Sequence, residues 1–192
     1  MADLGSSDGS GPGWDDRAAR EEFVRATYVG LFRWFGRLSG SPDRAADLAQ
    51  DTFAAYWASA GRARAGVSPR TWLYAIGRNL WRKHLRDRKP RAPALSLVDR
   101  PDAGGRAPDQ DLHDREFREA ADRAVGALPA DLREAFTLRF WQGFEYEEIG
   151  QVQGVAAALA RWRYFAARRR LHRALGAWDP DRERAEENQH AR

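Results

Sequence analysis

The sequence predicts an all-α fold, in which two small helical domains are joined by a flexible acidic linker and the second domain carries a helix-turn-helix. Sustained period-two alternation is absent, and Ala, Leu, Arg and Glu dominate between the Pro and Gly breakers, a composition that favours helices. Residues 90–113 are rich in Pro, Gly and Asp and follow neither the helical nor the strand period, so they are predicted to be a solvated linker. Near the C-terminus a short helix, a glycine-containing turn and a longer basic helix follow in the order typical of a helix-turn-helix.

The first domain is predicted to span residues 15–89, after a Gly- and Ser-rich N-terminus, residues 1–14, that we expect to be disordered. Proline after serine marks the start of its second and third helices, because proline fits the first turn of a helix. A loop with Gly and Arg, residues 61–67, separates these two helices, and Pro90 ends the third. The predicted helices are residues 15–38, 42–60 and 68–89.

The second domain is predicted to span residues 114–177, followed by a disordered tail at residues 178–192. Its joints are short and are marked by Leu128-Pro129, Gln142-Gly143 and Gly154. The predicted helices are residues 114–127, 129–141, 145–153 and 155–177. The chain shows no internal repeat.

Composition excludes several classes of function. The chain has no cysteine, so disulfides, thiolate metal sites and cysteine nucleophiles are ruled out, as in a protein of the reducing cytoplasm. Its four histidines are scattered without ligand spacing, and no Ser, His and Asp arrangement or phosphate-binding loop is present, so we expect neither a metal, a cofactor nor an enzyme. No run of eighteen apolar residues occurs and the N-terminus is acidic, so we expect a cytoplasmic protein without membrane insertion.

The positive charge is concentrated in two segments, although the net charge is only +4. Residues 70–91 carry eight Arg or Lys against the single acid Asp87, and residues 161–173 carry six Arg and no acid. Because the two segments fall on different domains, they predict two contacts with a polyanion.

Helical spacing sorts the second and third helices of the first domain into faces. In the second, Ala45, Ala49, Thr52, Phe53 and Tyr56 share an apolar arc, and the acidic residues Asp47 and Asp51 face away with Gln50. That acidic face is either a docking surface or a solvated one. In the third, Trp72, Leu73, Ile76 and Leu80 oppose a rail of Arg78, Arg82, Arg86 and Lys89, and Trp81 lies between them. Arginines mixed with aromatic rings suit phosphates and unstacked bases, and a solvated arginine face is the plainer alternative.

Two stretches resemble a known family. Residues 47–53 (DLAQDTF) and 68–80 (SPRTWLYAIGRNL) resemble region 2 of extracytoplasmic-function (ECF) sigma factors. Residues 127–129 (ALP), 133–136 (REAF), 138–140 (LRF) and 143–150 (GFEYEEIG) are similar to region 4 of the same factors. The resemblance runs from about Glu21 to Leu175 in family order and spacing.

The resemblance implies a transcription-initiation factor that binds core RNA polymerase and promoter DNA. The acidic helix would dock on the clamp helices of the largest polymerase subunit, through Asp47, Leu48, Gln50, Asp51 and Phe53. The loop and the third helix would melt the minus-ten element and capture a flipped base, through Arg62, Arg64, Ser68, Trp72, Arg78, Asn79, Trp81 and Arg82. The last helix would enter the major groove of the minus-thirty-five element, with contacts from Arg161, Trp162, Arg163, Phe165 and Arg169.

The resemblance also implies partners. Region 4 would reach the flap of the polymerase, the acidic linker would follow the RNA-exit side, and an anti-sigma protein is a candidate inhibitor.

The last helix departs from the family pattern. Residues 155–160 (VAAALA) stand where such factors usually place Pro, Gly, Thr and Ser, so hydroxyls that could cap the helix or bind a phosphate are missing. Trp162 and Phe165 are expected to project among arginines, an arrangement that needs an explanation. Contact with thymine methyl groups, packing against a partner protein, and loss of DNA reading by this helix are the three alternatives.

The rival class is a helix-turn-helix regulator that binds duplex DNA by itself, or an adaptor that holds other regulators. The acidic face and the Trp/Arg helix of the first domain have no role in such a protein. Polymerase binding that depends on Asp47 and Gln50 would favour the sigma factor, whereas tight duplex binding by the isolated chain would favour the regulator.

Overall fold

A computed structural model describes residues 17–59, 66–87 and 108–176, and this part of the chain contains seven α-helices and no strand. The all-α prediction is therefore confirmed for the described residues. The predicted disordered ends, most of the predicted linker, and Arg62 and Arg64 lie outside them. The helices are α1 (Arg17–Ser39), α2 (Pro42–Ala58), α3 (Pro69–Asp87), α4 (Pro108–Gly126), α5 (Ala130–Phe140), α6 (Tyr146–Gln153) and α7 (Ala157–Leu175).

The helix boundaries agree with the predicted ones to within a few residues, except at the start of α4. That helix begins at Pro108, six residues before the predicted start at residue 114, inside the segment interpreted as linker. Proline is well suited to the first turn of a helix, because its fixed φ matches the helix and its missing N–H has no partner there. The Pro- and Asp-rich composition that indicated a linker also describes a helix start.

Local signals in the sequence set the joint between α1 and α2. Gly40 adopts a φ of 64°, a left-handed conformation that glycine tolerates best, and its N–H donates to the carbonyl of Gly36 at 2.8 Å. The Ser41 hydroxyl then accepts a hydrogen bond from the backbone N–H of Arg44 at 3.4 Å, with Pro42 at the first position of α2. The chain therefore reverses direction within two residues, and α2 packs along α1.

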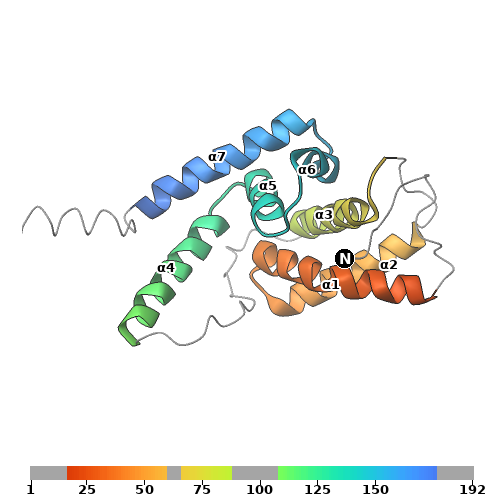
Figure 1. The fold of residues 1–192 in the computed structure, drawn as a ribbon, viewed down its shortest axis with the longest axis horizontal. Helices are drawn as coiled ribbons and strands as arrows, with labels where there is room; N and C mark the ends of the chain where they lie inside the picture. Colours follow the sequence, from red (N-terminus) through yellow and green to blue (C-terminus); the bar gives the residue numbers. More distant parts are fainter. Residues whose placement is uncertain (1–16, 60–65, 88–107, 177–192) are drawn as a thin grey trace, which may run out of the picture.

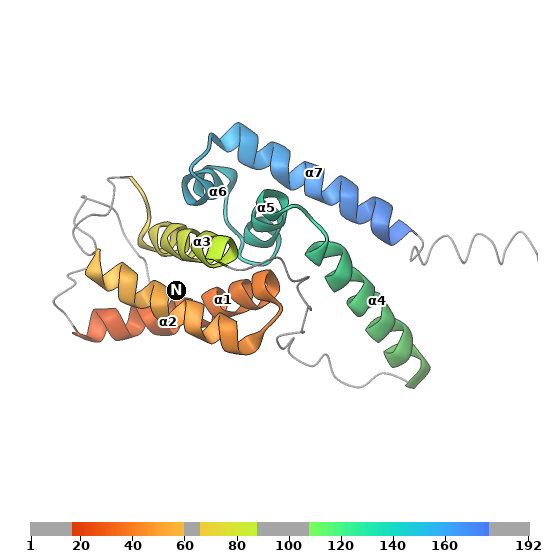
Figure 2. The same cartoon turned by 180° about the vertical axis from the view of Figure 1, so that it is seen from behind.

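α3 lies between two groups of helices. α1 and α2 pack on one side of it, and α6 packs on the other, with α5 and α7 beyond (Figures 1 and 2). α4 contacts α7 and extends away from α1–α3. The N-terminal unit, α1–α3, and the C-terminal unit, α4–α7, are thus in direct contact.

The buried core crosses from one unit to the other. Leu31, Trp34 and Leu73 of the N-terminal unit belong to the same apolar cluster as Leu138 and Ile149 of the C-terminal unit. A second, smaller cluster joins the helices of the C-terminal unit alone: Val125, Leu128, Leu132, Phe136, Ala166, Ala167 and Leu171. One core therefore serves both units, which the sequence alone could not show, because helical spacing identifies an apolar face without identifying what covers it.

Candidate nucleic-acid interface

The acidic face of α2 is exposed as predicted. Asp47, Gln50 and Asp51 lie on the surface. Their neighbours Leu48 and Phe53 are buried in the core, so in this structure these two residues pack α2 against the other helices. The exposed acids therefore form the part of α2 that a partner can reach.

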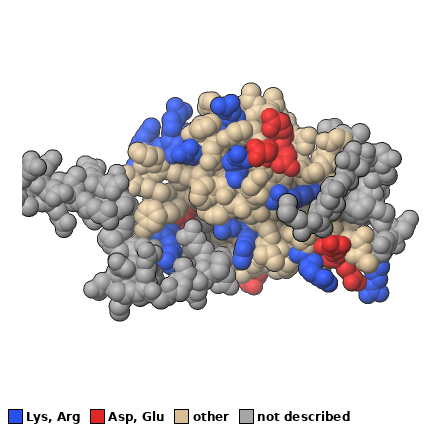
Figure 3. All heavy atoms as spheres, viewed as in Figure 1, with Lys and Arg blue, Asp and Glu red and all other residues tan. Residues whose placement is uncertain are grey.

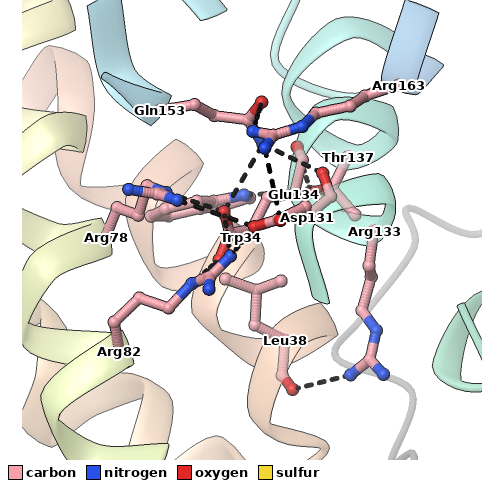
Figure 4. A network of polar contacts seen from close by, with 10 residues as sticks. All are labelled: Trp34, Leu38, Arg78, Arg82, Asp131, Arg133, Glu134, Thr137, Gln153 and Arg163. Carbon is pink, nitrogen blue, oxygen red and sulfur yellow. Dashed lines mark hydrogen bonds and ion pairs between the residues drawn. The ribbon is translucent and has the colours of Figure 1, made fainter. Parts of the chain in front are cut away.

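The arginine rail of α3 faces the C-terminal unit. The Nε atoms of Arg78 and Arg82 each donate to a different carboxylate oxygen of Glu134 in α5, both at 2.7 Å. Arg82 also donates to Asp131, one turn earlier on α5, and an Arg78 nitrogen lies 3.7 Å from the same carboxylate. Figure 4 shows the two arginines reaching from α3 toward both acids.

The two acids are held in place from within the C-terminal unit. The Gln153 amide at the end of α6 donates to the Asp131 carbonyl at 2.9 Å and to a Glu134 carboxylate oxygen at 3.4 Å. Arg163 of α7 donates to the Gln153 side-chain oxygen at 2.9 Å and to Asp131 at 3.3 Å. In Figure 4 Gln153 and Arg163 approach the acids from the side opposite the α3 arginines. The carboxylates are therefore also held by contacts within the C-terminal unit.

Burial and charge compete in this cluster. Burial opposes the ionisation of Asp131, but the hydrogen bond and charge of Arg82, with the charges of Arg163 and Arg78, outweigh it and hold the pKa of Asp131 below its usual value. The hydrogen bond from Arg82 to Glu134 raises the pKa of Arg82 further above its ordinary range. Glu134 is fully buried, and these two arginines bind both of its carboxylate oxygens.

A second set of contacts joins α3 to the loop and helix that follow α5. The Tyr74 hydroxyl donates to the Gln142 side-chain oxygen at 2.8 Å, and the Thr71 hydroxyl donates to Glu148 at 3.1 Å. The Arg70 guanidinium lies 4.2 Å from the centre of the Phe144 ring. Burial raises the pKa of Tyr74 above its usual value, opposed in part by Arg70, so the hydroxyl stays protonated as a donor.

Two further contacts tie α1 to the C-terminal unit. The Trp34 indole N–H, fully buried, donates to the Thr137 hydroxyl at 3.0 Å. Arg133 donates to the carbonyl of Leu38 at the end of α1, at 3.5 Å, and to the carbonyls of Gly126 and Leu128 between α4 and α5. Burial lowers the pKa of Arg133, and the charge of Glu134 opposes that effect.

α6 and α7 meet in a tight glycine turn. α6 begins with a capping box in which Glu145 and Glu148 each bind the other's backbone N–H, and it ends at Gly154, whose φ of 68° is left-handed. α7 starts at Ala157 with no side-chain cap on its N-terminus. This is the helix-turn-helix geometry that the sequence predicts.

The outer face of α7 carries exposed aromatic residues among arginines. Trp162 is 58% exposed and Phe165 is 41% exposed, and both line a shallow hollow with Arg169 and Arg173. Basic atoms gather along α7 in the space-filling view, whereas acidic atoms gather near α6 (Figure 3). The surface therefore combines positive charge with rings that a ligand can reach.

The comparisons with known proteins agree with this geometry. Residues 23–91 match the family described as Sigma-70 region 2, and residues 118–175 match Sigma-70, region 4. The RNA polymerase sigma-H factor of Pseudomonas aeruginosa is 35% identical over 141 residues, which cover 68% of this chain and 72% of that protein. The chain belongs to the ECF sigma factors of bacterial RNA polymerase.

Other relatives extend the match. The ECF RNA polymerase sigma factor SigE of Mycolicibacterium smegmatis is 33% identical over 162 residues, 83% of this chain and only 60% of that longer protein. The solved sigma factor RpoE of Bartonella quintana, in complex with the anti-sigma factor NepR, is 26% identical with a TM-score of 0.63, covering 81% of this chain and 96% of that one. Members of this family are not enzymes.

In this sigma factor the residues predicted for the minus-ten contact are only partly accessible. Ser68 and Asn79 are exposed, and Trp72 is half-buried and lines a hollow together with the turn between α6 and α7. Arg78 and Arg82 are bound to region 4. Trp81 is 5% exposed and stacks on His84, although helical spacing placed it between the two faces of α3.

The residues predicted for the minus-thirty-five contact divide into two groups. Arg161, Trp162, Phe165 and Arg169 are exposed on α7. Arg163 turns inward to Asp131 and Gln153, so in this structure it holds region 4 together.

Sequence reasoning did not single out the partners that join the two regions. Asp131, Thr137, Trp34 and Gln153 were assigned no role, and Glu134 was noted only as part of the family motif. One signal was available: Glu134 lies among Leu132, Ala135 and Leu138, at a position of α5 where its neighbours are buried. A charged residue on a buried face needs a partner of opposite charge.

No other type of site is found in the part of the chain that the structure describes. It holds no group of three or more His, Cys, Asp or Glu that could bind a metal ion. Within the same residues, no helix has both the length and the apolarity needed to cross a membrane.

Proposed function

We propose that this ECF sigma factor binds core RNA polymerase through the acidic face of α2 and directs it to promoters through α3 and α7. The exposure of Asp47, Gln50 and Asp51 beside a fully packed inner face carries the proposal, since it leaves an acidic surface free for a large partner. We place these contacts on the clamp helices of the largest subunit. Leu48 and Phe53 support the surface from below.

Region 2 then opens the minus-ten element. Asn79, Trp72 and the arginine rail of α3 line the surface that receives the separated strand, with Ser68, Arg62 and Arg64 at the preceding loop. Flipping a base costs a few kcal/mol of stacking and pairing, which aromatic and guanidinium planes can offset. Arg78, Arg82 and Trp81 reach DNA only after region 4 leaves α3 and the packing around Trp81 changes.

Region 4 binds the minus-thirty-five element with the outer face of α7. Arg161 and Arg169 contact phosphates, while Trp162 and Phe165 contact thymine methyl groups in the major groove. The first turn of α7 offers only Ala and Leu side chains, so direct hydrogen-bond readout of base edges is weaker than in a helix that begins with polar residues.

The remaining partners follow from the family. Region 4 contacts the polymerase flap, the acidic linker lies along the RNA-exit side, and the factor acts in the cytoplasm. The complex between RpoE of Bartonella quintana and NepR supports an anti-sigma protein as a partner of this chain as well.

The test is a pull-down of core RNA polymerase with wild-type chain and with Asp47→Arg/Gln50→Ala. The double variant should lose binding, whereas Glu22→Arg, which changes an exposed acid of α1, should bind as wild type does. Polymerase that carries the wild-type chain should also initiate from promoter DNA. If the wild-type chain fails to bind polymerase but binds duplex DNA tightly, it is a stand-alone regulator instead.

A further inference from the structure

We propose that Asp131 and Glu134 of region 4 act as an anionic latch on Arg78 and Arg82 of region 2, so that the closed chain and melted promoter DNA compete for the same two guanidinium groups. The inference rests on the proposed role of α3 in binding DNA. It goes beyond that role because it assigns residues of region 4 to controlling access to region 2.

The latch takes up the donors that a phosphate would need. Each oxygen of Glu134 accepts from a different guanidinium at 2.7 Å, and Asp131 accepts from Arg82 as well. Carboxylates and phosphates are bound by arginine with the same forked geometry. A strand can therefore bind these arginines only after the acids have left.

The latch is buried and prearranged, unlike an ordinary surface ion pair. Glu134 is completely buried and the Arg78 side chain is only 15% exposed, whereas the Arg17–Glu21 pair on α1 is largely solvent-exposed. Exposed pairs contribute little, but removal of one partner of a buried pair leaves an uncompensated charge. Gln153 and Arg163 fix the acids from the region 4 side, so the acids are already in position when α3 docks.

The rest of the interface covers the same helix. Gln142 and Glu148 bind Tyr74 and Thr71, one to three turns before the arginines on α3, and the turn between α6 and α7 faces Trp72 across a hollow that both line. The outer face of α7 points away from this contact (Figure 1). In the closed chain the arginines of the minus-ten surface are therefore occupied by region 4, while the minus-thirty-five surface is open.

Opening of the latch can be measured by fluorescence transfer between two dyes. The chain has no cysteine, so cysteines placed at the exposed positions Ala54 on α2 and Arg170 on α7 label one residue in each region. Asp131→Asn/Glu134→Gln should lower transfer relative to wild type. Glu21→Gln/Asp43→Asn removes the same amount of charge from exposed acids and should leave transfer unchanged.

The same proteins are then titrated with a short AT-rich single-stranded oligonucleotide. If the competent state is a minor one, opening it raises the apparent affinity in proportion, and we expect about tenfold tighter binding by the latch variant. The charge-matched control should bind as wild type does, which separates opening from a general gain in positive charge. Circular dichroism confirms that the variants remain helical.

A second variant leaves the acids in place. Gln142→Ala removes the acceptor of the Tyr74 hydroxyl, and it should lower transfer and tighten oligonucleotide binding in the same direction, by a smaller factor. This variant tests the proposal even if the double carboxylate change unfolds region 4.

A locked chain tests the converse. The Gln151 side chain reaches the Gly66 carbonyl at 3.5 Å, so cysteines at Val67 and Gln151 can be joined by a short reducible bismaleimide. The locked chain should lose oligonucleotide binding and regain it when the linker is reduced. The same cysteines capped with a monofunctional maleimide should bind as the reduced protein does.

The outcomes separate this inference from the proposed function. Unchanged transfer in the latch variants, opening without tighter binding, or full binding by the locked chain would overturn the latch, whether or not polymerase binding holds. Failure of the wild-type chain to bind polymerase would instead overturn the sigma-factor role.

Discussion

The two basic helices, α3 and α7, look alike in sequence but differ in what surrounds them. Both are rich in arginine and aromatic residues, and both predict contact with nucleic acid. The central arginines of α3 bind two carboxylates of region 4, at a contact where the two regions share one core. The arginines and rings on the outer face of α7 are exposed. A charge pattern thus predicts which surface suits a polyanion, but it does not predict whether that surface is available.

Removal of the largest side chain at the contact between the two regions should have the largest effect on stability. Trp34→Ala deletes a fully buried indole that packs in the shared core and donates to Thr137, and we expect a loss of about 3–5 kcal/mol in the free energy of unfolding. Denaturant unfolding measures this. Trp34→Phe should lose less, because an aromatic ring remains. A change below about 1 kcal/mol in Trp34→Ala would show that the core between the regions contributes little.

Overpacking of α3 against α1 and α2 should have the next largest effect. A Cβ at Gly77 would lie 2.9 Å from Cζ of Phe35 and 3.3 Å from the Thr52 side chain, so Gly77→Val should destabilise the chain by about 1–3 kcal/mol through overpacking. Gly176, where an added Cβ meets nothing within 4 Å, provides the matched Gly→Val control. Thermal unfolding of both variants checks this, and equal melting temperatures would contradict the packing of α3 on α1 and α2.

Acid should weaken the contact between α3 and region 4 while leaving the outer face of α7 unaffected. The pKa of Asp131 is lower in the folded chain than in the unfolded one, so its stabilising contribution is complete above its unfolded pKa, roughly 4, and is lost as the pH falls through the lower folded value. Fluorescence transfer between the two regions should be constant near neutral pH and should fall below about pH 4. Asp131→Asn should have a weaker acid response, and an unaltered response would contradict the role of this carboxylate.

The smallest effect on stability is expected on α7. Trp162 is mostly exposed, so Trp162→Ala should change the free energy of unfolding by no more than about 0.5 kcal/mol. The same variant, in complex with polymerase, should lose affinity for promoter fragments that carry the minus-thirty-five element, as measured by filter binding. Unchanged promoter affinity would leave a protein partner, or a helix that no longer reads DNA, as the explanation for the exposed ring. Arg170→Ala is the control at another exposed position of α7.

Much of the fold could be predicted from the sequence because its local signals agree with its tertiary structure. Proline, serine and glycine marked most helix boundaries, and the apolar arc of α2 is buried as predicted. The Pro- and Asp-rich start of α4 was misinterpreted as linker, since the same residues favour a turn and the first turn of a helix. The exposed acids of α2 and the exposed rings of α7 were also predicted correctly.

The candidate site was predicted less completely. Helical spacing placed Trp81 between two faces, but the ring is buried in the core that the two units share. Arg163 was predicted to contact DNA from its charge and its position on the last helix, and in this structure it turns inward to Asp131 and Gln153. In both cases the outcome depends on a neighbour that lies far away in the sequence.

The sequence by itself determined the helical fold, the order of the two regions, the acidic face of α2 and the two basic helices, because all of these depend on local propensity, helical period and motif. Only the tertiary structure decided that Glu134 and Asp131 bind the arginines of α3 and that one core serves both regions. The physical reason is that a period assigns each side chain to a face, while the free energy of a buried charge or an apolar face depends on the partner that covers it.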